Sequence, residues 1–285
     1  MQNTKKKETE RWGYNMLKHN TVGKGEDERA VNGGLDKYYT KPFIADYYSN
    51  IVIERYGQNN TFVEPCAGNG SFLRLFENIR AYDLLPEKSG IIKMDVFDNT
   101  FEPSDIIVTN PPFGMNASLA QSIFNHIASF KVKAICYVAP RTFKKKSLQD
   151  KLDLNYHLVF EQDIIKNAFT VDGRNKDVPC VFQIWELKSK KRNKTENIKS
   201  EWLDFVQKGI EVDICVRRAG GKAGKVLDGT DHSESSTYFI KTKHPMVHKA
   251  LQLIDLSVTD YTAGVKSISK QELMDEVDRI MEVLV

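Results

Sequence analysis

The sequence has no long apolar run and few cysteines, and both absences narrow what the protein can be. No segment approaches the roughly 18 apolar residues of a membrane-spanning helix, and the lysine-rich start lacks the apolar part of a secretory signal. The four cysteines, Cys66, Cys136, Cys180 and Cys215, form no CxxC pair and no zinc-binding spacing. We therefore expect a cytoplasmic protein with reduced cysteines, no metal site and no contact with membranes.

The chain also lacks a strong charge of either sign. Its 285 residues carry 41 Lys and Arg against 38 Asp and Glu, a net charge of +3 that identifies no partner. Basic residues nevertheless gather at 141–146, 188–194 and 217–225. Each group is either a solvated surface or a site that neutralises nucleic-acid phosphates, and the sequence leaves both readings open.

Three regions differ in their patterning. Residues 1–34 are polar and indicate a flexible N-terminal arm. Residues 35–187 alternate strands and helices, which predicts an α/β domain with a mostly parallel sheet. Its expected strands are 61–65, 79–83, 91–94, 105–109, 133–139, 156–161 and 178–186, and its expected helices are 41–54, 70–78, 116–129 and 145–152. Residues 188–285 predict a small α+β region, with helices at 196–208, 245–254 and 269–284 and strands at 211–217 and 237–241.

One polar loop follows the first strand of the α/β domain, with the sequence Glu64-Pro65-Cys66-Ala67-Gly68-Asn69-Gly70. Its two glycines allow a tight turn and close approach to a ligand, and a helix starting at Ser71 would direct backbone amides and a positive dipole end toward it. The loop has Leu73 where a dinucleotide-binding loop has its third glycine, and it lacks the lysine of a P-loop.

The next two strands each end in an acid. Asp83 lies about one βαβ unit downstream of the loop, where a carboxylate suits ribose hydroxyls, and Asp95-Val96 lies where an adenine ring would rest. An aspartate alone is often only a cap, but three successive polar strand ends favour a nucleotide-like cofactor.

A second loop, Asn110-Pro111-Pro112-Phe113, follows the strand at 105–109. The Asn110 side-chain oxygen and the Pro111 backbone oxygen can accept the two N–H bonds of a planar amine, and Phe113 can stack on its ring. The two prolines fix the geometry. The alternative is a plain turn leaving a strand.

The motifs together resemble those of the amino-group DNA methyltransferases that make N6-methyladenine, and their order resembles the gamma class. In order along the chain they are Tyr39-Thr40-Lys41-Pro42, the glycine loop, Asp83, Asp95 and the Asn-Pro-Pro-Phe loop. The resemblance implies a Rossmann-like class I methyltransferase fold with a seven-stranded, mostly parallel sheet whose last strand is antiparallel. It implies S-adenosyl-L-methionine as cofactor, bound by Tyr39, Thr40, Glu64, Pro65, Ala67, Gly68, Gly70, Asp83, Asp95, Val96 and Asn110. The implied catalytic residues are Asn110, Pro111, Pro112 and Phe113.

The family also carries an aromatic residue, in the loop before the last strand, that packs against the extruded target base. Phe169, followed by the polar loop 170–177, is the best match, with plain packing as the alternative. Phe160 and Phe182 alternate within strands and are expected in the core. We also expect Arg217, Arg218 and Lys222, in the glycine-rich loop 218–225 and just before it, either to contact a phosphate backbone or to form a mobile surface loop.

The prediction is a site-specific adenine-N6 DNA methyltransferase, with residues 35–187 as catalytic domain and 188–285 as target-recognition or accessory region. Its partner would be DNA, with a cognate restriction nuclease possible. The alternatives are an RNA adenine-N6 methyltransferase and a non-catalytic nucleic-acid-binding subunit. A protein-glutamine methyltransferase is disfavoured because Phe113 stands where tyrosine is expected.

Overall fold

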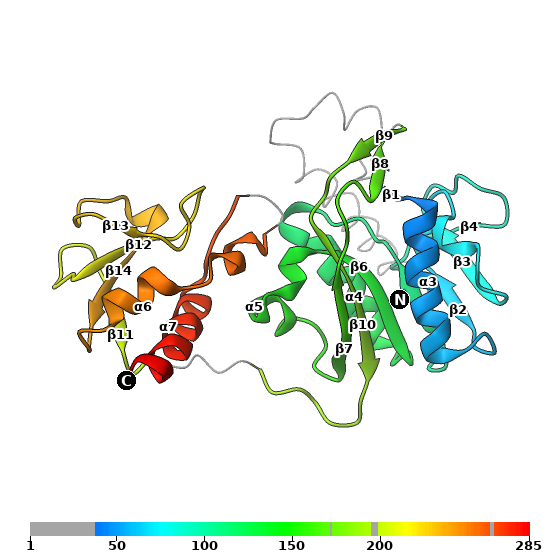
Figure 1. Ribbon diagram of the computed structural model, residues 1–285. Coiled ribbons are helices and arrows are strands. Elements are labelled where there is room, and N and C mark those ends of the chain that lie inside the picture. Colours follow the sequence, from blue (N-terminus) through cyan, green and yellow to red (C-terminus); the bar gives the residue numbers. More distant parts are fainter. Residues whose placement is uncertain (1–37, 172, 195–198, 263–264) are drawn as a thin grey trace, which may run out of the picture. The chain divides into compact units, whose positions relative to one another are not determined.

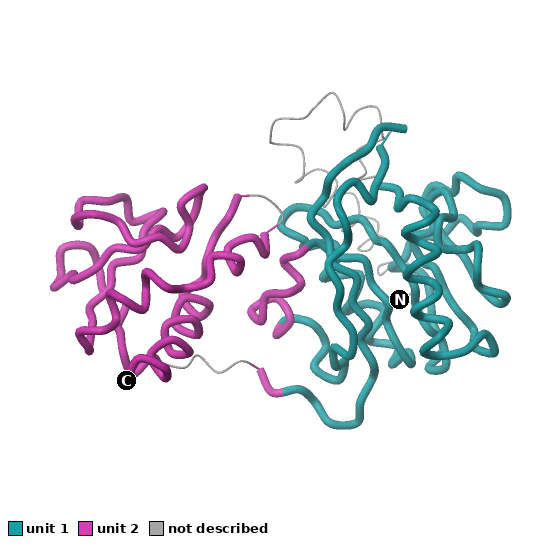
Figure 2. The backbone as a smooth tube through the Cα atoms, viewed as in Figure 1, with its two compact units in different colours: residues 1–140, 151–192 teal, residues 141–150, 193–285 magenta. Residues whose placement is uncertain are grey.

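The structure is a computed structural model that describes residues 38–171, 173–194, 199–262 and 265–285. The expected arm over 1–34 lies outside these ranges. The chain divides into two units, which we describe separately (Figure 2). The first contains residues up to Pro140 and Lys151–Arg192, and the second contains Arg141–Asp150 and Asn193–Val285. The first unit thus ends near residue 192, and the short segment 141–150 belongs to the second.

The first unit is built on a seven-stranded sheet (Figure 1). Its strands are β2 (Phe62–Glu64), β3 (Ile79–Asp83), β4 (Ile92–Lys93), β5 (Ile106–Thr109), β6 (Ala134–Pro140), β7 (Tyr156–Asp163) and β10 (Cys180–Leu187). They lie in the order β4-β3-β2-β5-β6-β10-β7. Only β10, the last strand of this sheet in sequence order, is antiparallel to its neighbours. The expected Rossmann-like, mostly parallel seven-stranded sheet is confirmed.

Helices cover both faces of this sheet, which explains why its central strands are apolar throughout. Helix α3 (Pro42–Tyr56) packs Ile44, Tyr48 and Val52 against one face, in a core with Phe62 and Phe182. Helix α4 (Ser118–Ser129) covers the other face, where Phe124 makes edge-to-face contacts with Tyr137, Tyr156 and Trp185. Two consecutive strands, β5 and β6, are buried over their whole length.

A small three-stranded sheet lies beside the main one and was not expected. It consists of β1 (Tyr39–Thr40), β8 (Phe169–Val171) and β9 (Arg174–Lys176), in the order β1-β8-β9. Thr40 pairs with Phe169, and the Lys41 amide donates to the Ala168 carbonyl at 2.9 Å. The stretch expected to be a polar loop after Phe169 is therefore a hairpin that holds the residues just before α3.

The expected helix over 70–78 is wrong. A short 3-10 helix, η1 (Ser71–Leu73), follows Gly70, and the chain then runs in turns to β3. The Gln58 side chain donates to the Leu75 carbonyl and accepts from the Glu77 amide, so it satisfies backbone groups that a helix would pair internally. The glycine loop therefore has no long helix dipole behind it.

The second unit has its own α+β core, as expected. Its four-stranded antiparallel sheet has the order β11-β14-β12-β13, formed by β11 (Leu203–Val206), β12 (Ile214–Arg217), β13 (Val226–Leu227) and β14 (Thr237–Thr242). The unit also contains the helices α5 (Lys146–Gln149), α6 (Val247–Leu253) and α7 (Lys270–Leu284). Its 3-10 turns are η3 (Arg141–Lys144), η4 (Glu234–Ser236) and η5 (Leu256–Asp260), and a further one, η2 (Met115–Ala117), belongs to the first unit. Helix α7 begins with a Ser269–Glu272 capping box and buries Leu273, Val277 and Met281.

The expected helix over 196–208 is also wrong, because Leu203–Val206 forms β11 and pairs with β14. Leu203 is buried, Asp204 is exposed, and the last two residues of the strand are half-buried. Among the described helices, none is long and apolar enough to cross a bilayer.

Candidate active site

The two loops singled out in the sequence leave the sheet at its topological switch point. Strand β2 pairs in parallel with β3 on one side and β5 on the other, so the chain order reverses between β2 and β5. Glu64 ends β2, and Asn110 follows Thr109 at the end of β5. Because parallel strands end at the same edge, the two loops leave side by side, where open α/β sheets bind ligands.

The glycine loop has a backbone that other residues could not easily adopt. Gly68 and Gly70 have φ values of 50° and 80°. A Cβ atom at Gly68 would lie 3.2 Å from Cε1 of Tyr39, so the Tyr39 ring packs directly on the loop. The Tyr39 hydroxyl donates to the Glu87 carboxylate, and the Glu87 amide donates to the Gly68 carbonyl at 3.2 Å. Ala67 and Pro65 in the same loop are buried.

Glu64 is a buried acid with 2% of its surface exposed. Loss of hydration raises the pKa of its carboxyl to about 8. The nearby Thr109 hydroxyl and the hydrogen bond from the Cys66 amide oppose this rise, and nearby Asp83 adds to it. Its Oε1 atom accepts from the Cys66 amide at 3.0 Å. A neutral buried carboxyl of this kind ionises readily when a cation is placed beside it.

Asp83 and Asp95 shape the loops that follow β3 and β4. The Asp83 carboxylate accepts from the Gly68 and Leu85 amides, both at 2.7 Å, and so joins the end of β3 to the glycine loop. Asp95 accepts from the Phe97 amide at 3.0 Å, and adjacent Val96 is buried. Each carboxylate oxygen keeps a second lone pair for a ligand hydroxyl or amine.

Asn110 is held with its side-chain nitrogen turned inward. Nδ2 donates to the Tyr38 carbonyl at 2.9 Å and to the Thr40 hydroxyl at 3.1 Å. A carbonyl can only accept, so the reversed amide would set two oxygens against each other. The Asn110 Oδ1 atom is buried and has no hydrogen-bond partner among the described residues. A buried, oriented acceptor without a donor is costly unless a ligand supplies one.

The backbone after Asn110 is tightly constrained. Pro111 is buried, Pro112 is half-buried, and Phe113 packs in part on the main core. A Cβ atom at Gly114 would lie 2.7 Å from Cβ of Leu119, so only glycine fits there. Asn116 and Ala117 follow with φ values of 53° and 63°, conformations that non-glycine residues rarely adopt and that concentrate at functional sites.

Phe169 lies in the core of the first unit. Its side chain is fully buried in the main core with Ile44 and Phe182, and its backbone pairs with Thr40. The structure shows Phe169 as a packing residue, and its contact with a target base stays a prediction. The apolar character of Phe169 is common to both roles, so the sequence could not separate them.

The basic candidates lie in the second unit. The Arg217 Nε donates to the Ala219 carbonyl at 3.1 Å, whereas Arg218 and Lys222 are exposed. The basic group at 141–146 is used internally: Lys145 pairs with Glu272 and Lys146 with Asp275, each at 3.4 Å, and the Lys144 Nζ lies 4.8 Å from the Tyr261 ring centroid. Of these groups, Arg218 and Lys222 are therefore better placed for a ligand.

Two contributors to the site were missed from the sequence. The Tyr38 carbonyl orients Asn110, and Glu87 links Tyr39 to the glycine loop. Neither has a sequence signal, because one acts through its backbone and the other stands in a loop without a motif. Within the described ranges, no group of three or more His, Cys, Asp and Glu side chains is placed to hold a metal ion.

Comparison with known proteins places a recognised domain over this region. Residues 57–190 match the EDM2 methyltransferase-like domain, a stretch slightly shorter than half of the chain. The matched stretch runs from just before β2 to just after β10, so it contains the whole seven-stranded sheet and both candidate loops. No curated protein matches the chain.

Three similar solved structures share little sequence with it. A candidate RNA methyltransferase of Pyrococcus horikoshii is 15% identical, with 54% of this chain and 88% of that one covered and a TM-score of 0.44. A modification subunit of a candidate type I restriction enzyme from Vibrio vulnificus YJ016 is 15% identical, with 56% and 46% covered and a TM-score of 0.39. A protein of Thermoplasma acidophilum is 16% identical, with 59% and 99% covered and a TM-score of 0.38.

Proposed function

We propose that this protein is an S-adenosylmethionine-dependent methyltransferase that modifies the N6 amino group of adenine in DNA. The match of residues 57–190 to a methyltransferase-like domain supports the reaction class. The observation that carries the proposal is the buried, unpartnered Oδ1 atom of Asn110 at the switch point of the sheet. An amine with two N–H bonds is the group that such an acceptor fits.

Asn110 and Pro111 are the proposed catalytic residues. The exocyclic amine of adenine is a weak nucleophile because its lone pair is delocalised into the ring. Two acceptors, Asn110 Oδ1 and the Pro111 carbonyl, would hold its N–H bonds and favour the pyramidal form that can attack. This preference is strongest in the transition state, where binding energy accelerates the reaction. Pro112 fixes the loop, and the half-buried Phe113 ring would stack on the base.

The glycine loop and three carboxyls suit the cofactor. The positively charged methionine end of S-adenosylmethionine would lie near Glu64, and the buried carboxyl of Glu64 would then release its proton. Asp83 would accept from the ribose hydroxyls and Asp95 from the adenine amine, with Tyr39, Thr40, Pro65, Ala67 and Val96 forming the walls. When bound, S-adenosylmethionine supplies a methyl group on a sulfonium, and the chain's own residues only bind and orient.

DNA is preferred to RNA because the order of the motifs resembles the DNA-modifying gamma class. The test is to incubate the full chain with tritiated S-adenosylmethionine and, separately, with duplex DNA, RNA and a protein extract. We expect label in DNA and, after digestion to nucleosides, N6-methyladenine. Label in RNA alone would assign the RNA alternative, and label in protein alone would reject both nucleic-acid substrates.

The role of Asn110 is tested by replacing it with alanine. Asn110→Ala should slow transfer by about 100- to 1,000-fold, the typical effect of removing one preorganised transition-state contact. Cofactor binding by calorimetry should remain measurable. The matched control is Asn59→Ala, an exposed asparagine in the turn before β2, which should change neither quantity. Full turnover by Asn110→Ala would contradict the assignment.

A further inference from the structure

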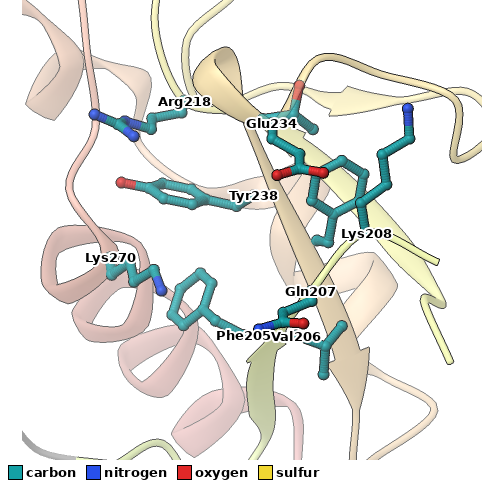
Figure 3. Close-up of a pocket in the computed structure, with 10 residues that line it drawn as sticks. Phe205, Val206, Gln207, Lys208, Arg218, Glu234, Tyr238 and Lys270 are labelled. Atoms are coloured by element: carbon teal, nitrogen blue, oxygen red, sulfur yellow. The ribbon is translucent and has the colours of Figure 1, made fainter. Parts of the chain in front are cut away.

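The second unit contains a hollow of about 490 Å³ at the place where one pair of strands ends (Figure 3). Strand β11 pairs with β14 from Leu203 opposite Thr242 to Val206 opposite Phe239. Strand β14 extends further, to Thr237, which pairs with Arg217 of β12 on its other side. The hollow is therefore bordered by a short stretch of β14 that the described part of β11 does not cover.

Among the side chains that line this hollow, two aromatic rings each lie close to a cation. The rings of Phe205 and Tyr238 meet edge to face, with centroids 5.2 Å apart. The Arg218 guanidinium lies 5.9 Å from the Tyr238 centroid, and the Lys270 Nζ lies 4.8 Å from the Phe205 centroid (Figure 3). Among the described residues neither cation has an acidic partner, so both positive charges are available to an anionic ligand.

Thr237 gives an independent sign of a ligand. It lines the hollow with only 4% of its surface exposed, and its Oγ1 atom is buried without a hydrogen-bond partner among the described residues. Buried hydroxyls are normally paired, because an unpaired one loses its hydrogen bonds to water without gaining one in the protein. A polar atom of a bound molecule would satisfy it.

We propose that this hollow binds one nucleotide of an unpaired nucleic-acid strand. Its volume is within the range of small-molecule pockets. Cations beside ring faces are the usual combination for single strands, in which phosphates meet Arg or Lys and bases stack on aromatic side chains. The Glu234 carboxylate and the Thr237 hydroxyl both belong to lining residues and can meet the polar edge of the base. An acidic peptide would use the cations and would gain nothing from the aromatic rings.

The inference rests on the proposed function only in naming a polynucleotide rather than a free nucleotide. It assigns binding to residues that are separate from Asn110 and from the glycine loop. The sequence predicted a nucleic-acid contact in the glycine-rich loop 218–225, whereas the inference assigns this contact to the hollow. Of the basic residues in that loop, only Arg218 lines the hollow.

The experiment measures binding of the full chain to a fluorescein-labelled single-stranded oligonucleotide of mixed sequence by fluorescence anisotropy. Unlabelled duplex, adenosine monophosphate and polyglutamate serve as competitors. Phe205→Leu should weaken binding about ten-fold through loss of stacking. Arg218→Ala and Lys270→Ala should each weaken it and make its salt dependence shallower. Lys249→Ala, an exposed lysine on α6, is the matched control and should have no effect.

Thr237→Val separates ligand binding from a purely structural role. The valine has the same shape without the hydroxyl, so the thermal midpoint should stay equal or rise while oligonucleotide affinity falls. A lower midpoint with unchanged affinity would overturn the role given to Thr237. Equal affinities for Phe205→Leu, Arg218→Ala, Lys270→Ala and Lys249→Ala would overturn the site, and so would polyglutamate displacing the oligonucleotide from it.

Failure of this inference can be told apart from failure of the proposed function. Asn59→Ala, which lies outside both sites, should bind the oligonucleotide like the unmodified chain. If no acceptor is methylated but the hollow variants lose binding, the inference stands and the proposed function falls. If DNA is methylated but the hollow variants bind normally, the reverse holds. Displacement of the oligonucleotide by adenosine monophosphate at equal concentration would identify a free-nucleotide site and overturn the assignment of the hollow to a polynucleotide.

Discussion

The two units differ in the polar groups they bury. Among its described residues the first unit buries two acids and two amides in addition to hydroxyl-bearing residues: Glu64, Asp105, Asn99 and Gln183. The buried polar residues described in the second unit are all hydroxyl-bearing: Ser200, Thr237 and Thr259. In the second unit, several charged pairs lie at the surface, such as Lys208–Asp231 and Lys243–Asp204. Buried polar groups fix geometry and are costly when unpaired, whereas surface charges adapt at little cost. The first unit is therefore built for a rigid site and the second for adaptable contacts.

The largest effect should come from Phe169, which tests whether the hairpin next to Thr40 is structural. Phe169→Ala removes a fully buried ring and should lower the free energy of unfolding by about 3 to 5 kcal/mol. Urea unfolding followed by circular dichroism measures this. A variant of normal stability that failed only in methyl transfer would instead restore the predicted contact between Phe169 and the target base.

Glu64 tests the cost of the buried acid. Its pKa in the folded protein, about 8, is above that of an unfolded glutamate, so the folded state holds a proton that the unfolded state releases. Stability from this group is full below about pH 4.5 and is lost as pH rises through about 8. Between about pH 5 and pH 9, the free energy of unfolding of Glu64→Gln should therefore rise relative to that of the unmodified chain by on the order of 3 kcal/mol.

The measurement is the free energy of unfolding of both proteins across this pH range. A constant difference between them would show that Glu64 is ionised in the free protein. Calorimetry in buffers of different ionisation enthalpy adds a second readout. S-adenosylmethionine should displace a proton from the unmodified chain near neutral pH, and this proton release should be missing in Glu64→Gln.

Thr40 tests the preorganisation of Asn110. Thr40→Val keeps the shape of this buried residue and removes the hydroxyl that accepts from Nδ2. An unpaired buried N–H costs about 1 to 3 kcal/mol, and we expect turnover to fall by roughly 5- to 100-fold with a smaller change in KM. Thr40→Ser should recover most of the rate. Equal rates for valine and serine would show that the hydroxyl does not position the amide.

The smallest effect should come from Lys146, which lies in the second unit, where we expect adaptable contacts. Its pair with Asp275 is exposed, so Lys146→Ala should change the free energy of unfolding by less than about 0.5 kcal/mol. Oligonucleotide affinity should also stay unchanged, because this basic segment is not part of the hollow. A clear loss of affinity would extend the nucleic-acid contact to residues 141–146.

The sequence determined the main sheet almost completely. Strands such as β5 and β6 are short apolar runs bounded by polar turns, and burial on both faces leaves no other place for them. The site at the sheet edge could likewise be predicted, because glycines, acids and prolines directly after strands have few alternatives there. The helices expected at 70–78 and 196–208 were wrong because Gln58 and β14, both distant in sequence, supply hydrogen bonds that the local pattern does not reveal.

Only the tertiary structure decided the roles of single side chains. Phe169 suited both a core and a base contact by its chemistry, and pairing of β8 with β1 placed it in the core. Likewise, the order of the strands brought the Tyr38 carbonyl and the Thr40 hydroxyl to Asn110 and left its oxygen without a partner. Sequence patterns specify which faces of an element are buried, but a hydrogen bond between residues 70 positions apart exists only once the chain has folded.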